Sequence, residues 1–253
     1  MNETRHKGIS FKVWGRYALF TDPLTRVGGE KCSYHIPTYE AMKGVCKSIY
    51  WKPTFIWIVD EVRVMKRIRT QTKGVKPLVL SGGNDLATYT FLANVEYQVR
   101  AHFEWNTHRP ELADDHNPGK HFAVAQRTLE RGGRQDIFLG TRDCQGYVEP
   151  CEFGSGAGAY DDTDELAFGL MFHGFDYPDE TGIDENQRGV LRARFGRPTM
   201  KDGVIRFPHP GSDNLIRKDV REMTAKRFVK DINLRGVGAE AAELQLEAGD
   251  GLD

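Results

Sequence analysis

Three side chains in the first half of the chain are of the types that acid–base chemistry on a phosphate requires: Tyr50, Lys120 and His121. Asn117-Pro118 is typical of a helix start, which places Lys120 and His121 in the first helical turn. A helix N-terminus attracts a phosphate, and its positive potential favours the neutral form of a nearby histidine. Neutral His121 can then act as general base, Tyr50 can position or exchange a proton, and Lys120 can stabilise a crowded phosphorane.

Such a set is sufficient to cleave RNA without a metal ion. The 2′-hydroxyl of the sugar attacks the adjacent phosphorus, which leaves a 2′,3′-cyclic phosphate and a 5′-hydroxyl, and DNA lacks this nucleophile. A plain structural role is the alternative, because a Lys-His pair at a helix start is more often a surface feature and Tyr50 continues an apolar stripe. Spacing alone leaves both interpretations open.

The elements that position these side chains follow from hydrophobic periodicity. Alternating apolar and polar residues predict strands, the continuous apolar centre of 54–64 predicts a strand covered on both faces, and apolar residues at helical spacing predict helices. In chain order the expected elements are a strand at 9–13, a helix between Pro37 and Pro53, strands at 54–64 and 95–105, a helix from Pro118 to Gly132, and a strand beginning at 136. This order is the ferredoxin-like, split βαβ arrangement, which RRM-like RNA-binding modules share.

The ferredoxin-like topology brings the candidate residues together. Its first two strands run parallel, and the third lies antiparallel between them. The first helix therefore ends at the edge where the second strand begins, and the second helix begins at that same edge. We expect Tyr50 and Lys52, at the end of the first helix, to neighbour Lys120 and His121.

The net charge of −1 conceals two halves of opposite sign, because residues 1–150 carry +6 and residues 151–253 carry −7. A run of basic residues lies between 43 and 76, where Lys43 and Lys47 fall off the apolar stripe of the first helix. Such a run is either a solvated face or a surface that follows a phosphate backbone. The residues of the expected RNA-binding surface are Lys43, Lys47, Lys52, Lys66, Arg67, Arg69, Lys73 and Lys76.

The composition, with 39% hydrophobic and 28% charged residues, indicates a folded globular protein, and the order of the expected elements makes its class α+β. We expect a ferredoxin-like domain at 1–148, a smaller β-rich antiparallel domain at 149–231, and an acidic tail at 232–253 that is either a short helix or disordered. The chain has no apolar run of the ~20 residues that a membrane helix needs, and its first residues lack the apolar stretch of a secretory signal. The expected location is the cytoplasm, with no membrane partner.

Other chemistry has weaker support in the sequence. Asp114, Asp115 and His116 are of metal-ligand types, but a polar loop before a helix explains them better. The cysteines lack the spacing of a zinc knuckle, and the glycines at 154–158 are not followed by the Lys-Ser/Thr of a phosphate-binding loop. We therefore expect no metal and no cofactor.

Several long blocks of the sequence resemble a known family. They are residues 17–34, 37–44 (PTYEAMKG), 48–54 (SIYWKPT), 117–121 (NPGKH), 132–154 and 173–180 (HGFDYPDE). These blocks resemble the CRISPR-associated family-five protein of subtype I-C, a member of the RAMP superfamily, and the likeness runs from about residue 10 to about residue 228. The tail beyond about residue 231 has no matching motif.

The resemblance implies a RAMP fold and an activity. Members of this family cut precursor CRISPR RNA at the base of the repeat hairpin without metal. They then stay on the 5′ handle of the mature crRNA in the type I-C Cascade surveillance complex, beside its backbone and large subunits, and meet target DNA only through that complex. The resemblance also implies that Tyr50, Lys120 and His121 are catalytic. The alternatives are a non-catalytic crRNA-binding structural subunit and a metal-dependent DNA nuclease that uses carboxylates such as Asp114 and Asp115.

Overall fold

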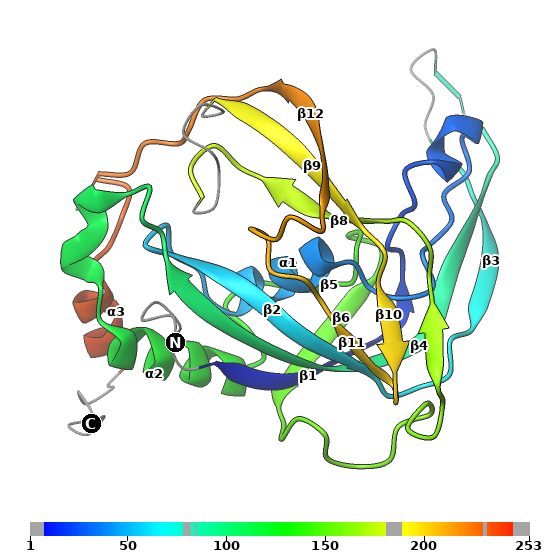
Figure 1. Cartoon of the computed structure of the whole chain (residues 1–253), viewed down its shortest axis with the longest axis horizontal. Helices are drawn as coiled ribbons and strands as arrows, with labels where there is room; N and C mark the ends of the chain where they lie inside the picture. The colour runs from blue at the N-terminus through cyan, green and yellow to red at the C-terminus, as the bar shows by residue number, and fades with distance from the viewer. Residues whose placement is uncertain (1–7, 78–81, 84, 181–188, 230–231, 245–253) are drawn as a thin grey trace.

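The computed structural model describes residues 8–77, 82–83, 85–180, 189–229 and 232–244. In chain order the elements, labelled in Figure 1, are β1 (Ile9–Ala18), η1 (Thr25–Gly28), α1 (Tyr39–Ile49), β2 (Phe55–Val64), β3 (Thr70–Val75), β4 (Ala87–Trp105), η2 (Pro110–Asp115), α2 (Pro118–Glu130), β5 (Ile137–Phe138), β6 (Gln145–Pro150), β7 (Glu165–Ala167), β8 (Met171–Asp176), β9 (Val190–Gly196), β10 (Thr199–Lys201), β11 (Val204–Arg206), β12 (Ile216–Glu222) and α3 (Val237–Glu243). Within these described ranges the strands form one sheet of nine strands and one of three. The predicted α+β class is confirmed. Of the described helices, none is long and apolar enough to cross a membrane.

The centre of the larger sheet has the ferredoxin-like strand order. β1 lies between β6 and β4, and β2 pairs with the other edge of β4. Both pairings of β4 are antiparallel, so β1 and β2 run parallel, as predicted. The strand predicted to begin at 136 is only the two-residue β5, and β6 takes the place beside β1. α1 contacts β2 and α2 contacts β1, which puts the two helices side by side.

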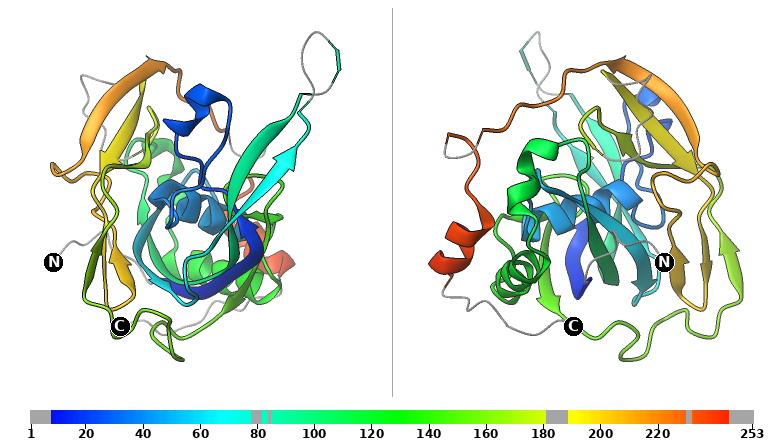
Figure 2. Two further views of the ribbon diagram at one scale, coloured as in Figure 1. Left: turned by 90° about the vertical axis from the view of Figure 1, so that its right-hand side faces the viewer. Right: turned by 60° about the vertical axis from the view of Figure 1, so that its left-hand side comes forward.

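The chain before the predicted strand at 95–105 is a hairpin and not a simple connection. β3 pairs with the first part of β4, from Thr70 opposite Leu92 to Val75 opposite Ala87. β4 therefore begins at Ala87, earlier than predicted. The residues of β3 are mostly exposed, so this segment lacks the apolar alternation by which a strand is predicted from sequence. Figures 1 and 2 show the hairpin extending away from the rest of the larger sheet.

Residues 149–231 contribute to both sheets. β11 pairs antiparallel with β2, with Ile205 opposite Val62, and β10 and β7 continue the larger sheet outward. In the smaller sheet β9 is the central strand, and it pairs antiparallel with β8 on one side and with β12 on the other. The β-rich, antiparallel character of this region is confirmed, and the domain boundary at 148 stays a prediction.

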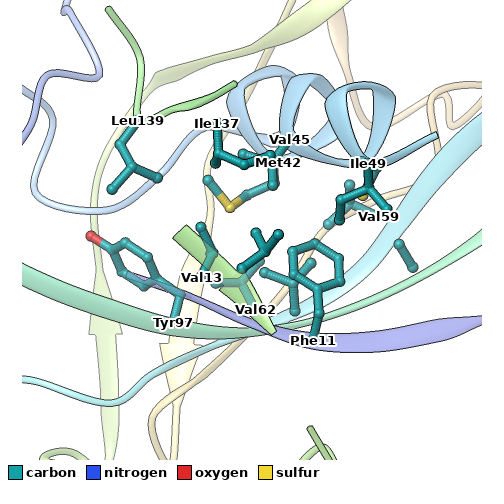
Figure 3. Packing of buried hydrophobic residues seen from close by; sticks show 14 of the residues in the cluster. Phe11, Val13, Met42, Val45, Ile49, Val59, Val62, Tyr97, Ile137 and Leu139 are labelled. Carbon is teal, nitrogen blue, oxygen red and sulfur yellow. The ribbon is translucent and has the colours of Figure 1, made fainter. Parts of the chain in front are cut away.

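The main hydrophobic core lies between α1 and the larger sheet (Figure 3). Met42, Val45 and Ile49 point from α1 toward Phe11 and Val13 of β1, and all five side chains are buried. The predicted apolar stripe of the first helix is therefore confirmed. Because this stripe is fixed against the sheet, the residue that ends α1 also has a fixed position.

Candidate active site

The end of α1 holds Tyr50 inside the protein. Tyr50 is the residue that follows the helix, with an extended backbone at φ −158°, and its carbonyl accepts the Nε1–H of Trp57 at 2.7 Å. Its side chain is fully buried, and its ring centre lies 5.5 Å from that of Phe55. The hydroxyl is therefore in the interior of the protein.

The first turn of α2 supplies His121. Asn117 caps this helix, as predicted, because its Oδ1 accepts the N–H of Lys120 at 2.9 Å. The Tyr50 hydroxyl lies 2.9 Å from His121 Nδ1, and His121 Nε2 lies 2.8 Å from the carbonyl oxygen of Asp115. The predicted meeting of the two helix ends is confirmed.

These two contacts determine where the protons of the Tyr50–His121 pair lie. A carbonyl oxygen only accepts, so His121 Nε2 carries the hydrogen and donates it to Asp115. The neutral imidazole then has a lone pair on Nδ1, which accepts the O–H of Tyr50. In this state the Tyr50 hydroxyl donates the hydrogen bond that His121 Nδ1 accepts.

Burial controls the charge state of the pair. It lowers the pKa of His121 to about 4. It also raises the pKa of Tyr50 far above its ordinary value. The rings of Phe55, Phe103 and Trp105 lie around the imidazole, with centres 5.2, 6.1 and 5.6 Å away. His121 is thus neutral at pH 7. The main cause is desolvation by burial, whereas the sequence analysis attributed the neutral form to the positive potential of the helix N-terminus.

The lowered pKa of His121 predicts a fold that acid weakens. Below about pH 6.5 the unfolded chain binds a proton on this histidine, whereas the folded chain binds it only near pH 4. The stability that neutral His121 contributes is complete above pH 6.5 and is lost as the pH falls toward 4. Between pH 7 and pH 4.5 the free energy of unfolding should therefore fall by roughly 2–3 kcal/mol because of His121. Urea unfolding at both pH values measures this loss, which should be smaller by that amount in His121→Gln. An equal loss in both proteins would contradict the assignment.

Lys52, which was predicted to lie beside the pair, is buried next to it. Its Nζ is 3.7 Å from Asp115 Oδ2 and 3.5 Å from Glu240 Oε1, and it donates to the carbonyl oxygen of Arg235. Asp115 Oδ2 also accepts the hydroxyl of Thr54 at 3.0 Å. The expected position of Lys52 is therefore correct, and two carboxylates already neutralise it.

Lys120 lines a cavity of about 360 Å³ next to the pair. Residues of η2, the first turn of α2 and the segment 234–239 form its walls. Lys120 is half-buried, so its charge is available to an anion that enters this cavity. Tyr50 and His121, in contrast, are fully covered.

The expectation that Lys43 lies on an open face of the first helix, toward solvent or RNA, is wrong. Its side chain is 1% exposed, and its Nζ lies 2.5 Å from Glu180 Oε2. Lys47, one turn further along α1, lies 3.2 Å from Glu180 Oε1 and stays partly exposed. The smaller sheet covers this side of α1, where the N–H of Phe175 donates to Glu40 Oε2 at 3.2 Å. The polar face of α1 is therefore an interface inside the protein.

The other residues of the expected RNA-binding surface lie at the base of the β3–β4 hairpin or on it: Lys66, Arg67, Arg69, Lys73 and Lys76. Arg67, Arg69 and Lys76 are exposed. Lys73 Nζ lies 3.3 Å from the centre of the Tyr17 ring, which places a cation and an aromatic face together. In Figure 1 this hairpin is on the opposite side of the molecule from α2 and α3. The RNA-binding role of these residues stays a prediction, for a surface that is distant from the pair.

Sequence reasoning missed two residues near the pair, Arg134 and Glu240. The backbone N–H of Arg134 donates to the carbonyl oxygens of Ser48 and Ile49 at the end of α1. Its Nη1 lies 3.4 Å from Glu240 Oε2. The glycine pair that ends α2 was the available signal for Arg134, because it returns the chain toward α1. No motif in the acidic tail pointed to Glu240.

The acidic residues near the pair are bound by other parts of the protein. Asp115 Oδ1 accepts the N–H of Val237 at 2.5 Å, while its Oδ2 bonds to Thr54. Across the described residues, no group of three or more His, Cys, Asp or Glu is placed to hold a metal ion. The alternative metal site at 114–116 thus has Asp115 already engaged.

The sequence of this chain matches a protein family over most of its length. The family model is described as CRISPR-associated protein (Cas_Cas5), of the Cas5d type, and it matches residues 8–208. The chain belongs to the Cas5d family. The resemblance to the subtype I-C family is thereby confirmed. The matched range contains Tyr50, Lys120 and His121, whereas α3 lies beyond it.

Two Cas5d relatives have names that state an activity. The CRISPR pre-crRNA endoribonuclease Cas5d of Mannheimia succiniciproducens is 26% identical over 239 residues, which cover 79% of this chain and 94% of the relative. The protein of the same name from Thermus thermophilus is 31% identical over 152 residues, which cover 56% of this chain and 63% of the relative.

Solved structures have the same fold. A crystal structure of a CRISPR-associated protein is 33% identical, with a TM-score of 0.70, and the match covers 85% of this chain and all of that one. A functionally uncharacterized protein from Streptococcus mutans is 34% identical, with a TM-score of 0.69, and the match covers 86% of this chain and all of that one. The Cas5d fold of this chain is therefore shown by both sequence and structure.

Proposed function

We propose that this Cas5d protein is an endoribonuclease that cuts precursor CRISPR RNA within the repeat. The observation that carries the proposal is the 2.9 Å contact between the Tyr50 hydroxyl and His121 Nδ1, where α1 and α2 meet and Lys120 lies alongside. The relatives from Mannheimia succiniciproducens and Thermus thermophilus, which are named pre-crRNA endoribonucleases, support the same activity.

In the proposed reaction the RNA supplies its own nucleophile. A base removes the proton of the 2′-hydroxyl, whose oxygen attacks the adjacent phosphorus. The bond from phosphorus to the 5′ oxygen breaks, and that oxygen takes a proton from an acid, which leaves a 2′,3′-cyclic phosphate and a 5′-hydroxyl. Neutral His121 accepts the first proton and Tyr50 donates the second, or the two exchange these roles. Lys120 stabilises the charge on the phosphorane.

After cleavage, in this proposal, the protein stays on the 5′ handle of the crRNA. There it joins the backbone and large subunits of a type I-C Cascade complex in the cytoplasm and meets target DNA through that complex. The exposed cations Arg67, Arg69 and Lys76 support the RNA contact, because each phosphate that a cation neutralises adds affinity that salt weakens.

The test is a cleavage assay on the repeat RNA of the source organism. One arm contains EDTA, and a second uses RNA with a 2′-deoxy sugar at the scissile position. We expect the rate in EDTA to equal the rate in Mg²⁺, the deoxy RNA to stay intact at that position, and end-group analysis to find the 2′,3′-cyclic phosphate. A metal requirement, or cleavage of the deoxy RNA, would overturn the mechanism. Tight handle binding without cleavage would indicate a structural subunit.

A further inference from the structure

The segment 232–244, which ends in α3, covers the candidate active site. The N–H of Val237 donates to Asp115 Oδ1, and the carbonyl oxygen of Arg235 accepts from Lys52. Val237 and Ala241 are buried in this contact. Figures 1 and 2 both show α3 lying beside α2, whose first turn holds His121. This segment, called the tail below, is therefore packed against the site.

Glu240 places a carboxylate between the cations of the site. It is 7% exposed, with Oε1 3.5 Å from Lys52 Nζ and Oε2 3.4 Å from Arg134 Nη1. After burial, the charge of Glu240 is the next largest cause of the raised pKa of Tyr50. An anion thus sits close to the hydroxyl that the proposed reaction uses. Carboxylates and phosphates accept the same charged hydrogen bonds from Lys and Arg.

The balance of charge around Glu240 suits a phosphate in its place. With the tail in position, Lys52 and Arg134 face the carboxylates of Asp115 and Glu240. Without Glu240, this group has one positive charge in excess, which matches the single negative charge of a phosphodiester. Lys120, on the neighbouring cavity, adds to the same positive potential.

No nucleotide reaches the pair while the tail is in place. Tyr50 and His121 are both fully buried, and each already donates its hydrogen bond to a protein acceptor. The rings of Phe55 and Phe103 belong to the central sheet strands and cannot leave without unfolding the core. The polar contacts of the tail with Lys52, Asp115 and Arg134 are ones that an RNA backbone can replace, and the buried side chains of Val237 and Ala241 complete the contact.

We propose that residues 232–244 are a displaceable lid, in which Glu240 occupies the place of the scissile phosphate on Lys52 and Arg134. Repeat RNA displaces the lid and exposes His121 and Tyr50. Free protein is therefore held in a closed, inactive state. This inference rests on the proposed endoribonuclease function, and it adds Lys52 and Arg134 as residues that bind the substrate phosphate.

The first test follows amide hydrogen exchange of the full chain, free and bound to repeat RNA with a 2′-deoxy sugar at the scissile position. We expect amides of 237–244 to exchange about tenfold faster in the complex, while those of α1 stay protected. Exchange of 237–244 that is unchanged or slower in the complex would overturn the lid. This measurement does not depend on cleavage.

The second test compares two identical substitutions on α3. Ala241 is buried and Ala242 is exposed, so Ala241→Glu should open the lid, whereas Ala242→Glu should leave it closed. Both variants gain the same negative charge, which repels RNA equally. We expect diethyl pyrocarbonate to modify His121, and repeat RNA to be cleaved under single-turnover conditions, about tenfold faster in Ala241→Glu than in Ala242→Glu or wild type.

The outcomes separate the lid from the proposed function. Equal cleavage and equal His121 modification in all three proteins would overturn the lid and leave the nuclease in place. Faster modification of His121 in Ala241→Glu, with no cleavage by any of the proteins, would support the lid and overturn the nuclease. Adding Arg134→Ala to Ala241→Glu should slow cleavage about tenfold, and an unchanged rate would overturn Arg134 as a phosphate ligand.

Discussion

His121→Ala is expected to slow cleavage of repeat RNA by about 10²–10⁴-fold while leaving RNA binding intact, because removal of one general acid–base group typically has an effect of this size. The side chain is fully buried, and in the free protein it bonds only within the site, to Tyr50 and to the carbonyl of Asp115. It therefore contributes nothing to the exposed surface that holds RNA. Single-turnover cleavage gives the rate, and titration of the 2′-deoxy RNA gives the affinity.

The matched control is His209→Ala, which removes an exposed histidine whose Nε2 lies 3.3 Å from Glu104 Oε2. This variant should cleave at the wild-type rate. Tyr50→Phe keeps the ring in the core and removes only the hydroxyl, so it separates chemistry from packing. A His121→Ala protein that is folded by circular dichroism and cleaves as fast as His209→Ala would remove His121 from the mechanism.

Glu180→Ala is expected to destabilise the protein by about 3–5 kcal/mol, because it leaves the charge of Lys43 buried without a partner. The 2.5 Å contact between Lys43 Nζ and Glu180 Oε2 joins α1 to the segment that follows β8. A lone ammonium at 1% exposure has no water to replace the lost carboxylate. Urea unfolding at pH 7, with fluorescence and circular dichroism as two probes, measures the free energy of unfolding.

The control for this variant is Glu130→Ala. Glu130 pairs with Arg127 on α2 at 3.3 Å, but both side chains are about half exposed. Removing that carboxylate should change the unfolding free energy by less than about 0.5 kcal/mol. If Glu180→Ala and Glu130→Ala are equally stable, the buried pair does not hold the two parts of the protein together.

The meeting of Tyr50 and His121 was predictable because it depends on local patterns and on topology. The apolar stripe that ends at Tyr50 and the Asn117 cap before His121 each belong to a single helix. The ferredoxin-like order then fixes which helix ends are neighbours. The stripe and the cap each lie within a few residues of the side chain that they place, and the strand order follows from the periodicity of successive segments.

The partners of the lysines were not predictable from the same patterns. Lys43 lies off the apolar stripe, and helical spacing alone makes that position look solvent-facing. Its partner Glu180 is 137 residues away, and the smaller sheet that brings it there has no periodic link to α1. Glu240 is a similar case, since a short acidic helix carries no local signal of the site on which it packs. Periodicity reports which face is apolar, and only tertiary packing decides whether a polar face meets water.

The pairing of β11 with β2 has a consequence for how the chain folds while it is being translated. β11 pairs with Glu61, Val62 and Arg63 on the edge of β2 that β4 leaves open. During translation this part of the edge stays unpaired until residues 204–206 have emerged from the ribosome. Unpaired strand edges pair with other chains and lead to aggregation. The second half of the protein therefore protects the first from misassociation, and nascent chains that stop before β11 lack that protection.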